Sequence, residues 1–350
     1  MAVRERKLTM RLMLTALLMA FGLAAVSATR RWQPRPEYDR MLDAANRAQA
    51  AFTAVKDEKL RRGLSIQKSD DLNETGLIGD YFTSITTTLG NLEAKRTSVN
   101  PNAAALVVRL LYDAGVRPGD RIAVNCSASF PALNLAVLCA MDAMELEGMI
   151  FSSVGASTYG ANLEEFTYPD MEYFLYTGGY IHRKSEFVSF GGANDQGLEF
   201  SEDVKNSIRI RLAGLGYQIW ETADLDENIQ ARLDCYGNIA CFVNVGGNLV
   251  STGGSTAYDS GSGLLEDSFD HRGLIGQYWT REIPVLHLLN LKKLFPQYGL
   301  PVDPIPMPQP GEGSVYYEQA VFLPLVWMTL AAGMLALVWA VKGSVKRQPL

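Results

Sequence analysis

Two serines that follow a short apolar run are the clearest candidate nucleophiles of this chain. Ser127 and Ser129 come directly after residues 121–125 (RIAVN), whose composition is that of a short buried strand. A serine hydroxyl attacks a carbonyl when a base takes its proton, and His271, preceded by Asp267, is a candidate for that base. Together these residues would perform hydrolysis or acyl transfer at an ester or amide bond.

Small and glycine-rich loops follow four of the predicted strands. Glycine lets backbone N–H groups approach a ligand closely, and a helix that starts after the loop adds a field favourable to an anion. Ligands of parallel sheets bind beyond the carboxyl ends of the strands, so we predict a cleft for a carboxylate or phosphate at that edge. The candidate ligand-binding residues in these loops are Ser153, Gly155, Ser157, Gly191, Gly192, Gly246 and Gly247.

One eight-residue segment occurs twice. Residues 76–83 (GLIGDYFT) and 273–280 (GLIGQYWT) are identical at six of eight positions. Two interpretations stay open: both copies form the same glycine-containing turn followed by a packed aromatic, or two glycine loops converge on one site. The second interpretation adds Gly76, Gly79, Gly273 and Gly276 to the candidate ligand-binding residues.

A further motif bears on hydrolytic chemistry. Residues 192–195 (GAND) resemble the GxND block of SGNH hydrolases, in which the asparagine helps to hold the oxyanion, so Asn194 and Asp195 become candidates as well. The GDS block of that family is absent, and Asp267 and His271 are one residue further apart than its DxxH spacing. No zinc-binding or calcium-binding spacing is present either, and the sequence predicts no metal site and no cofactor.

Alternating strands and helices must position these residues. The apolar patterns predict strands at residues 121–125, 148–153, 186–190, 217–220 and 239–245, and helices at 36–62, 103–112, 133–144, 201–212 and 225–233. Strands separated by helices of this length form βαβ units, which predicts an α/β fold with a mainly parallel sheet. His287 lies in an apolar run that we interpret as helical, where a packing role is expected.

Hydrophobic segments at both ends predict a membrane anchor. Residues 320–341 carry no charge and, at about 1.5 Å per residue, are long enough to cross the roughly 30 Å hydrocarbon core of a bilayer as a helix. Residues 12–29 follow a basic N-terminus and form either a signal sequence or a second anchor. Both alternatives place the segment between them outside the cytoplasm and the basic C-terminal tail inside it.

These features divide the chain. The predicted parts are a cytoplasmic N-terminus (1–11), the anchor or signal (12–29), a helical and loop region (30–99), the α/β domain (100–298), a proline-rich linker (299–319), the transmembrane helix (320–341) and a cytoplasmic tail (342–350).

The two terminal flanks each contribute +3 to the net charge of −6, so the segment between them carries −12. Such an acidic domain excludes nucleic acid as a partner. Outside the cytoplasm Cys235 and Cys241 could close a small disulfide loop.

Several segments together resemble the poly-gamma-glutamate system protein family of bacterial capsule operons. Besides the two anchors they are GLIGDY at 76–81, SSVGASTYGAN at 152–162, SFGGANDQG at 189–197 and GLIGQYW at 273–279. The resemblance implies an inner-membrane component that helps to make or export polyglutamate, with the bilayer, synthase membrane subunits and the polymer chain as partners. Three hypotheses stay open: this accessory role, a hydrolase or transferase acting on polymer amide or ester bonds, and an exported small-ligand-binding domain.

Overall fold

The computed structural model of the protein describes residues 2–267 and 271–342, which form two compact units. The central unit is Glu37–Tyr316, and the terminal unit combines residues 1–36 and 317–350. Of the basic C-terminal tail, Lys346 and Arg347 lie outside the described residues.

A seven-stranded, mostly parallel sheet forms the centre of the central unit. Its strand order is β7-β6-β3-β2-β8-β10-β9, and every pairing is parallel except that of β9 with β10. The strands are β2 (Arg121–Cys126), β3 (Glu147–Ser153), β6 (Phe187–Ser189), β7 (Gln218–Ile219), β8 (Cys241–Val245), β9 (Gly263–Leu264) and β10 (Val285–Leu288). The α/β fold with a mainly parallel sheet is therefore confirmed.

The strand order reverses beside β2. The chain steps outward from β2 through β3 and β6 to β7, and then returns to place β8 on the other side of β2. At such a switch point the loops after two neighbouring strands leave in opposite directions and open a crevice at their carboxyl ends. The loops after β2 and β8 therefore frame the natural ligand position of this fold.

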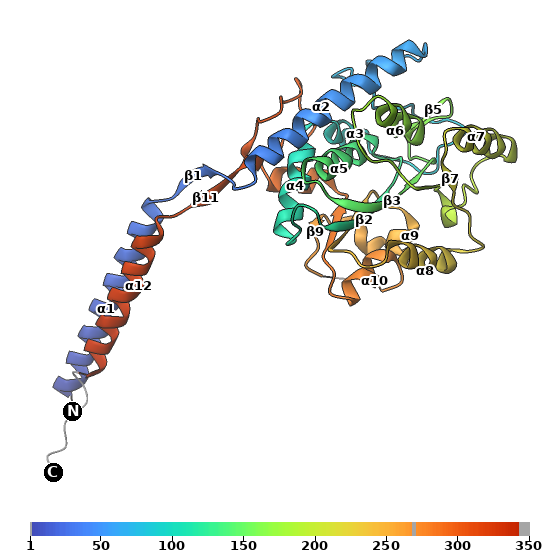
Figure 1. Ribbon diagram of the computed structural model, residues 1–350. Coiled ribbons are helices and arrows are strands. Elements are labelled where there is room, and N and C mark those ends of the chain that lie inside the picture. Colours follow the sequence, from blue (N-terminus) through green and yellow to red (C-terminus); the bar gives the residue numbers. More distant parts are fainter. Residues whose placement is uncertain (1, 268–270, 343–350) are drawn as a thin grey trace. The chain divides into compact units, whose positions relative to one another are not determined.

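Helices cover both faces of the sheet (Figure 1). One face carries α2 (Tyr38–Arg61), α4 (Asn102–Asp113), α5 (Pro131–Ala143) and α6 (Tyr168–Thr177), and the other carries α8 (Leu225–Tyr236), α9 (Leu249–Thr252) and α10 (Leu274–Thr280). The remaining elements of the unit are α3 (Leu92–Ser98), α7 (Glu202–Gly214), α11 (Leu291–Gln297), the short pair β4 (Asn162–Leu163) and β5 (Phe166–Thr167), and the 3₁₀ turns Ala193–Asp195, Thr256–Ser260 and Ser314–Tyr316.

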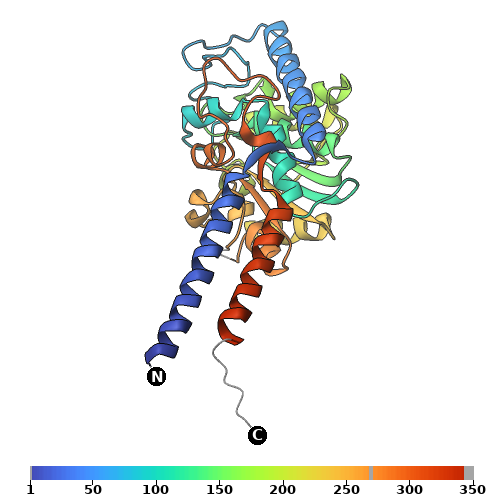
Figure 2. The ribbon, with the colours of Figure 1, turned by 90° about the vertical axis from the view of Figure 1, so that its left-hand side faces the viewer.

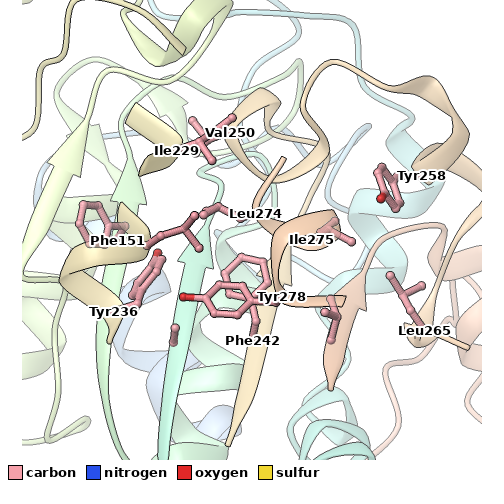
Figure 3. Packing of buried hydrophobic residues seen from close by; sticks show 13 residues of the cluster. Phe151, Ile229, Tyr236, Phe242, Val250, Tyr258, Leu265, Leu274, Ile275 and Tyr278 are labelled. Carbon is pink, nitrogen blue, oxygen red and sulfur yellow. The ribbon is translucent and has the colours of Figure 1, made fainter. Parts of the chain in front are cut away.

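Aromatic packing fixes the face under α8 and α10 (Figure 3). Phe151 from β3 packs against Tyr236 of α8, with ring centroids 5.2 Å apart, and Phe242 from β8 stacks on Tyr278 of α10 at 4.9 Å. All four side chains are completely buried. Alternating residues of each strand point to opposite faces, which is why a fully buried strand reads as a continuous apolar run in the sequence.

Two long apolar helices pack side by side in the terminal unit. Helix α1 (Ala2–Ala28) and helix α12 (Leu323–Lys342) run antiparallel, and strands β1 (Arg31–Pro34) and β11 (Tyr317–Ala320) pair next to them (Figures 1 and 2). Both helices are long and apolar enough to cross a membrane. Glycines allow their close approach, because a Cβ at Gly22 would overlap Thr329 and one at Gly333 would overlap Met19.

The structure corrects three expectations. His287 belongs to strand β10 and not to a helix. The repeated segment has two structures, since residues 77–80 are irregular whereas 274–280 form helix α10. The interpretation that both copies form the same turn is therefore wrong. Cys235 and Cys241 are free thiols.

The proline-rich run is bound along the central unit and does not stand free. Asn102, which is fully buried, donates from Nδ2 to Gln309 O at 2.9 Å and accepts from Gly311 N at 3.1 Å through Oδ1. Further along, Arg96 forms a bidentate ion pair with Asp303. Residues 299–316 are thus part of the folded unit, and only residues 317–319 of the expected linker lie outside it.

Substituting Asn102 tests this attachment. Asn102→Ala removes both hydrogen bonds to the proline-rich run, and we expect unfolding to become easier by about 1–3 kcal/mol. Limited proteolysis of the full chain should then cut faster within residues 299–313. Asn206→Ala, on the exposed face of α7, is the matched control and should leave cleavage unchanged. Equal cleavage of Asn102→Ala and the unsubstituted protein would show that the run is held by other contacts.

Candidate functional site

A cavity of about 960 Å³ lies at the carboxyl ends of five parallel strands. The loops after β2, β3, β6, β8 and β10 form most of its wall, and the segment that leads into α3 completes it. Its lining residues are Thr87, Thr88, Leu89, Gly90, Asn91, Ala94, Lys95, Ser127, Ser129, Phe130, Ser153, Gly155, Ser157, Gly191, Gly192, Ala193, Asp195, Glu199, Gly247, Asn248, Leu249, Leu289, Asn290, Leu291 and Lys292. The cleft predicted at this edge of the sheet is present.

Lys95 brings a buried amino group into the cavity wall. Helix α3 begins at its N-cap Asn91, whose side chain accepts a hydrogen bond from Ala94 N, and this fixes the first turn that carries Lys95. Lys95 is only 2% exposed. Its Nζ donates to the carbonyl oxygen of Ser129 and lies 2.7 Å from the Oγ of Ser157. No pattern in the sequence marks this lysine.

Burial sets the protonation state of Lys95. Desolvation disfavours the charged form and lowers the pKa of the amino group from 10.5 to about 7. The ring face of Phe130, 4.1 Å from Nζ, favours the cation, so both charge states are accessible near neutral pH. An amine that is partly neutral at pH 7 can accept a proton, which an exposed lysine cannot do.

Four serines of the loops after β2 and β3 line the cavity with Lys95. Ser157 N donates to Ser129 Oγ at 2.9 Å, and Ser129 N donates to Ser127 Oγ at 3.2 Å. Ser153 Oγ accepts from Ala128 N at 3.2 Å, which joins the β3 loop to the β2 loop. Among the described residues, the hydroxyl within hydrogen-bonding distance of the Lys95 amine is that of Ser157. The candidate nucleophile is therefore Ser157.

The loop after β6 is held in a strained conformation. Gly191, Gly192, Asn194, Asp195 and Gly197 all have positive φ angles, of 72°, 68°, 53°, 65° and 58°. For the two non-glycine residues this left-handed conformation costs about 1–2 kcal/mol each. Strain of this kind persists where surrounding contacts over-determine the backbone, and it often marks functional sites.

A buried ion pair supplies those contacts. Arg232 of α8 is 1% exposed, and its Nη2 lies 2.5 Å from Asp195 Oδ2. Asp195 also accepts from Ser189 Oγ at 2.7 Å and from Asn228 Nδ2 at 3.0 Å. The carboxylate is thus satisfied by three donors, and it anchors the strained loop to the face of the sheet under α8.

The same arginine starts a polar chain below the cavity floor. Arg232 Nη1 donates to Asn125 Oδ1 at 2.5 Å, Asn125 donates to Asn248 at 2.8 Å, and Asn248 donates to Asn244 at 2.9 Å. The chain ends where Asn244 Nδ2 meets His287 Nδ1 at 2.8 Å. Through Arg232 and Asp195 it connects strands β2 and β8 with the loops after β6 and β8.

His287 closes this chain as a neutral ring. An amide nitrogen can only donate, so Nδ1 accepts from Asn244, and Nε2 carries the proton that is donated to Tyr258 O at 3.2 Å. Desolvation lowers the pKa of His287 from 6.5 to about 4, in agreement with this tautomer. The packing role expected for His287 holds, although it packs from a strand.

The cavity gathers many of the residues that the sequence singled out and leaves others apart. Its wall contains Ser127, Ser129, Ser153, Gly155, Ser157, Gly191, Gly192, Asp195 and Gly247. Gly246 packs directly against Ser127, because a Cβ there would lie 2.9 Å from that of the serine. Outside the described wall lie Asn194, Asp267, His271, Gly76, Gly79, Gly273 and Gly276.

The base proposed from the sequence has other contacts. His271 is exposed, and its Nδ1 lies 3.2 Å from Thr280 Oγ1. Asp267 lines a separate cavity of about 340 Å³. Gly79 serves packing, since a Cβ there would overlap the carbonyl of Gly160. The structure therefore brings the predicted serines together with a lysine and not with the histidine.

Sequence reasoning missed Lys95 and Arg232 for a physical reason. Each is a single basic residue on a predicted helix or loop, and nothing in its neighbours distinguishes it from an exposed lysine or arginine. One signal was available for Arg232: it falls in a helix predicted at 225–233 that must pack on the sheet. Lys95 carries no comparable signal.

Comparison with known proteins adds no assignment. No protein-family model, curated protein or solved structure matches the chain. Function is therefore argued from the geometry of this cavity.

Breaking the ion pair tests its structural role. Arg232→Met leaves the Asp195 carboxylate buried without its counter-ion, and we expect a loss of about 3–5 kcal/mol of stability. Thermal unfolding of the full chain in detergent would measure it. Arg209→Met, which removes a surface pair with Glu221, is the control and should cost at most about 1 kcal/mol. The double variant Arg232→Met/Asp195→Asn should recover part of the loss, and an undiminished melting temperature in Arg232→Met would contradict this role.

Proposed function

We propose that this protein is a membrane-anchored serine–lysine enzyme that hydrolyses or transfers acyl groups. The observation that carries the proposal is the buried Lys95 amine, 2.7 Å from the Ser157 hydroxyl in the wall of the cavity. A serine nucleophile needs a base that is neutral at working pH, and desolvation gives this lysine that property.

The proposed reaction balances protons through Lys95. The neutral amine takes the Ser157 proton as Oγ attacks the carbonyl carbon of an ester or amide. The tetrahedral intermediate collapses, the bond to the leaving group breaks, and the departing alcohol or amine receives the proton from Lys95. Water or a second nucleophile then attacks the acyl-Ser157 ester, its proton passes through Lys95, and Ser157 Oγ is protonated again.

Ser129 has a supporting position in this scheme. Its Oγ accepts the backbone N–H of Ser157, which holds the two hydroxyl-bearing loops together. Ser129 lines the same cavity, and in this scheme its O–H donates to the developing oxyanion. Lys95 meanwhile donates to the Ser129 carbonyl, so the base and this supporting serine are fixed relative to each other.

The membrane placement is part of the proposal. Two antiparallel apolar helices, α1 and α12, with basic residues in the first turns of α1, support a double anchor with both chain ends in the cytoplasm. The central unit would then act outside the cytoplasm. The interlocking glycine contacts between α1 and α12 support an N-terminal helix that is retained after synthesis.

A second candidate function comes from the sequence segments themselves. The resemblance to the poly-gamma-glutamate system protein family supports a role in making or exporting that polymer, either as an accessory component or as the enzyme that cuts its amide bonds or those of an attached ester. Both forms of this role need the anchor, but only the second needs Ser157.

Substituting the dyad tests the enzymatic proposal. In the full chain, Ser157→Ala, Lys95→Met and Lys95→Arg should each lower hydrolysis of p-nitrophenyl esters by about 10²–10⁴-fold, because each removes the nucleophile or a neutral base. Ser207→Ala and Lys68→Met, both at exposed positions, are the controls. A fluorophosphonate probe should label Ser157 in the unsubstituted protein. Ester hydrolysis that survives in all three dyad variants would overturn the assignment, and normal polymer production in cells carrying Ser157→Ala would favour the accessory role.

The rate should also depend on pH through Lys95. The neutral amine is the active form and its pKa is lowered to about 7, so kcat/KM should rise with pH through about 7 and level off above it. Stopped-flow or plate-reader kinetics between pH 5 and pH 9 would record this. A rate that falls as pH rises through 7 would mean that the protonated amine is the active form.

Cysteine labelling tests the anchor. A cysteine placed at exposed Ser207 in a cysteine-free background should react with a membrane-impermeant maleimide in intact cells, whereas one placed at Ser344 should react only after the membrane is opened. The reverse pattern, or recovery of the full chain in the soluble fraction, would exclude the proposed topology.

A further inference from the structure

Three leucines contribute apolar surface to the cavity wall. Leu249, which begins α9, and Leu289, which follows β10, are half-buried in the wall, and Leu89 on the loop before α3 is 77% exposed. The polar loop that carries Gly192, Ala193 and Asp195 forms another part of the wall and contacts helix α9. A ligand that covers such an exposed aliphatic side chain binds more tightly, because apolar surface is removed from water.

Apolar residues of the wall lie close to the Lys95–Ser157 dyad. A Cβ added to Gly90 would lie 2.9 Å from Ser157 Oγ and 3.0 Å from Lys95 Cε, so the residue after Leu89 packs directly on the dyad. On the other flank, a Cβ at Gly246 would meet Phe130 at 3.7 Å, and one at Gly247 would meet Leu289 at 3.9 Å. Phe130 in turn covers the Lys95 amine. Apolar groups therefore lie on both flanks of the dyad: Leu89 is the neighbour of Gly90, and Phe130 lies between the Lys95 amine and the glycines that Leu289 approaches.

The charges of the wall do not suit a polyanion. Among the charged lining residues, Asp195 is paired with Arg232 and Lys292 is paired with Glu93. Glu199 accepts a hydrogen bond from Ala193 N and adds a negative charge. Lys95 is the remaining described cation of the wall, and it loses its charge near neutral pH. A substrate whose bound portion is uncharged fits this balance better than a run of carboxylates does.

We propose that Leu89, Leu249 and Leu289 form an acyl subsite, and that the substrate is an ester of an aliphatic carboxylic acid with several methylene groups. This inference rests on the proposed serine–lysine chemistry, since an acyl group attached to Ser157 must extend from that hydroxyl into the cavity. The subsite takes the aliphatic tail, and the polar loop with Gly192 and Ala193 takes the leaving group.

A series of esters tests the subsite. With p-nitrophenyl acetate, butyrate, hexanoate and octanoate, kcat/KM of the full chain should rise about threefold to fourfold for each methylene that enters the subsite. Leu89→Asn, Leu249→Asn and Leu289→Asn should flatten that dependence. Ile210→Asn, at a 75% exposed position on α7, is the matched control and should keep the full slope. Detergent partitioning of the longer esters affects all variants alike, so the difference in slope is the readout.

The outcomes separate the two proposals. Turnover of all esters at one rate, or a slope that is the same in the three leucine variants and the control, overturns the acyl subsite and leaves the serine–lysine assignment standing. Absence of turnover with every ester overturns the serine–lysine assignment and the subsite with it. Leu89→Asn distinguishes loss of the subsite from misfolding. The exposed Leu89 side chain contributes little to the core, so this variant should fold normally.

Discussion

The site depends on the exclusion of water from one amino group. A lysine that is 2% exposed gives up hydration that an ion would need, and the lowered pKa is the direct result. Helix α3 and its asparagine cap hold the lysine at that position, and the loops after β2 and β3 supply the carbonyl and hydroxyl that satisfy its nitrogen. Without this burial the lysine beside Ser157 would be a permanent cation and could not take the serine proton.

The sheet explains why such loops can meet at all. Parallel strands bring their carboxyl ends to one edge, and the reversal of strand order beside β2 opens that edge into a crevice. The loops there have little regular secondary structure, so their positions depend on the side chains beneath them. A buried polar network below the cavity floor holds these loops in place. It consists of Arg232, Asp195 and the asparagines of β2 and β8.

The acidic character of the chain and the scarcity of free positive charge in the cavity favour the proposed substrate. A segment with a net charge of −12 repels long polyanions, and the paired charges of the wall offer them no compensation. An aliphatic ester avoids that repulsion and matches the leucines beside the dyad. The two apolar terminal helices are consistent with work at a membrane, where acyl groups are abundant.

Hydrophobic periodicity by itself determined the α/β class, the positions of β2, β3 and β8 and the two apolar end helices, because these patterns follow from burial along a local stretch of chain. It also located the serine and glycine loops at one edge. Only the tertiary structure decided which side chains meet there: Lys95 reaches Ser157 across 62 residues, whereas His271 stays outside the wall. The repeated GLIG segment shows the reason most clearly. One copy is irregular beside Gly160 and the other is helical beside Gly253, because long-range packing, which no local pattern encodes, selects the conformation of each.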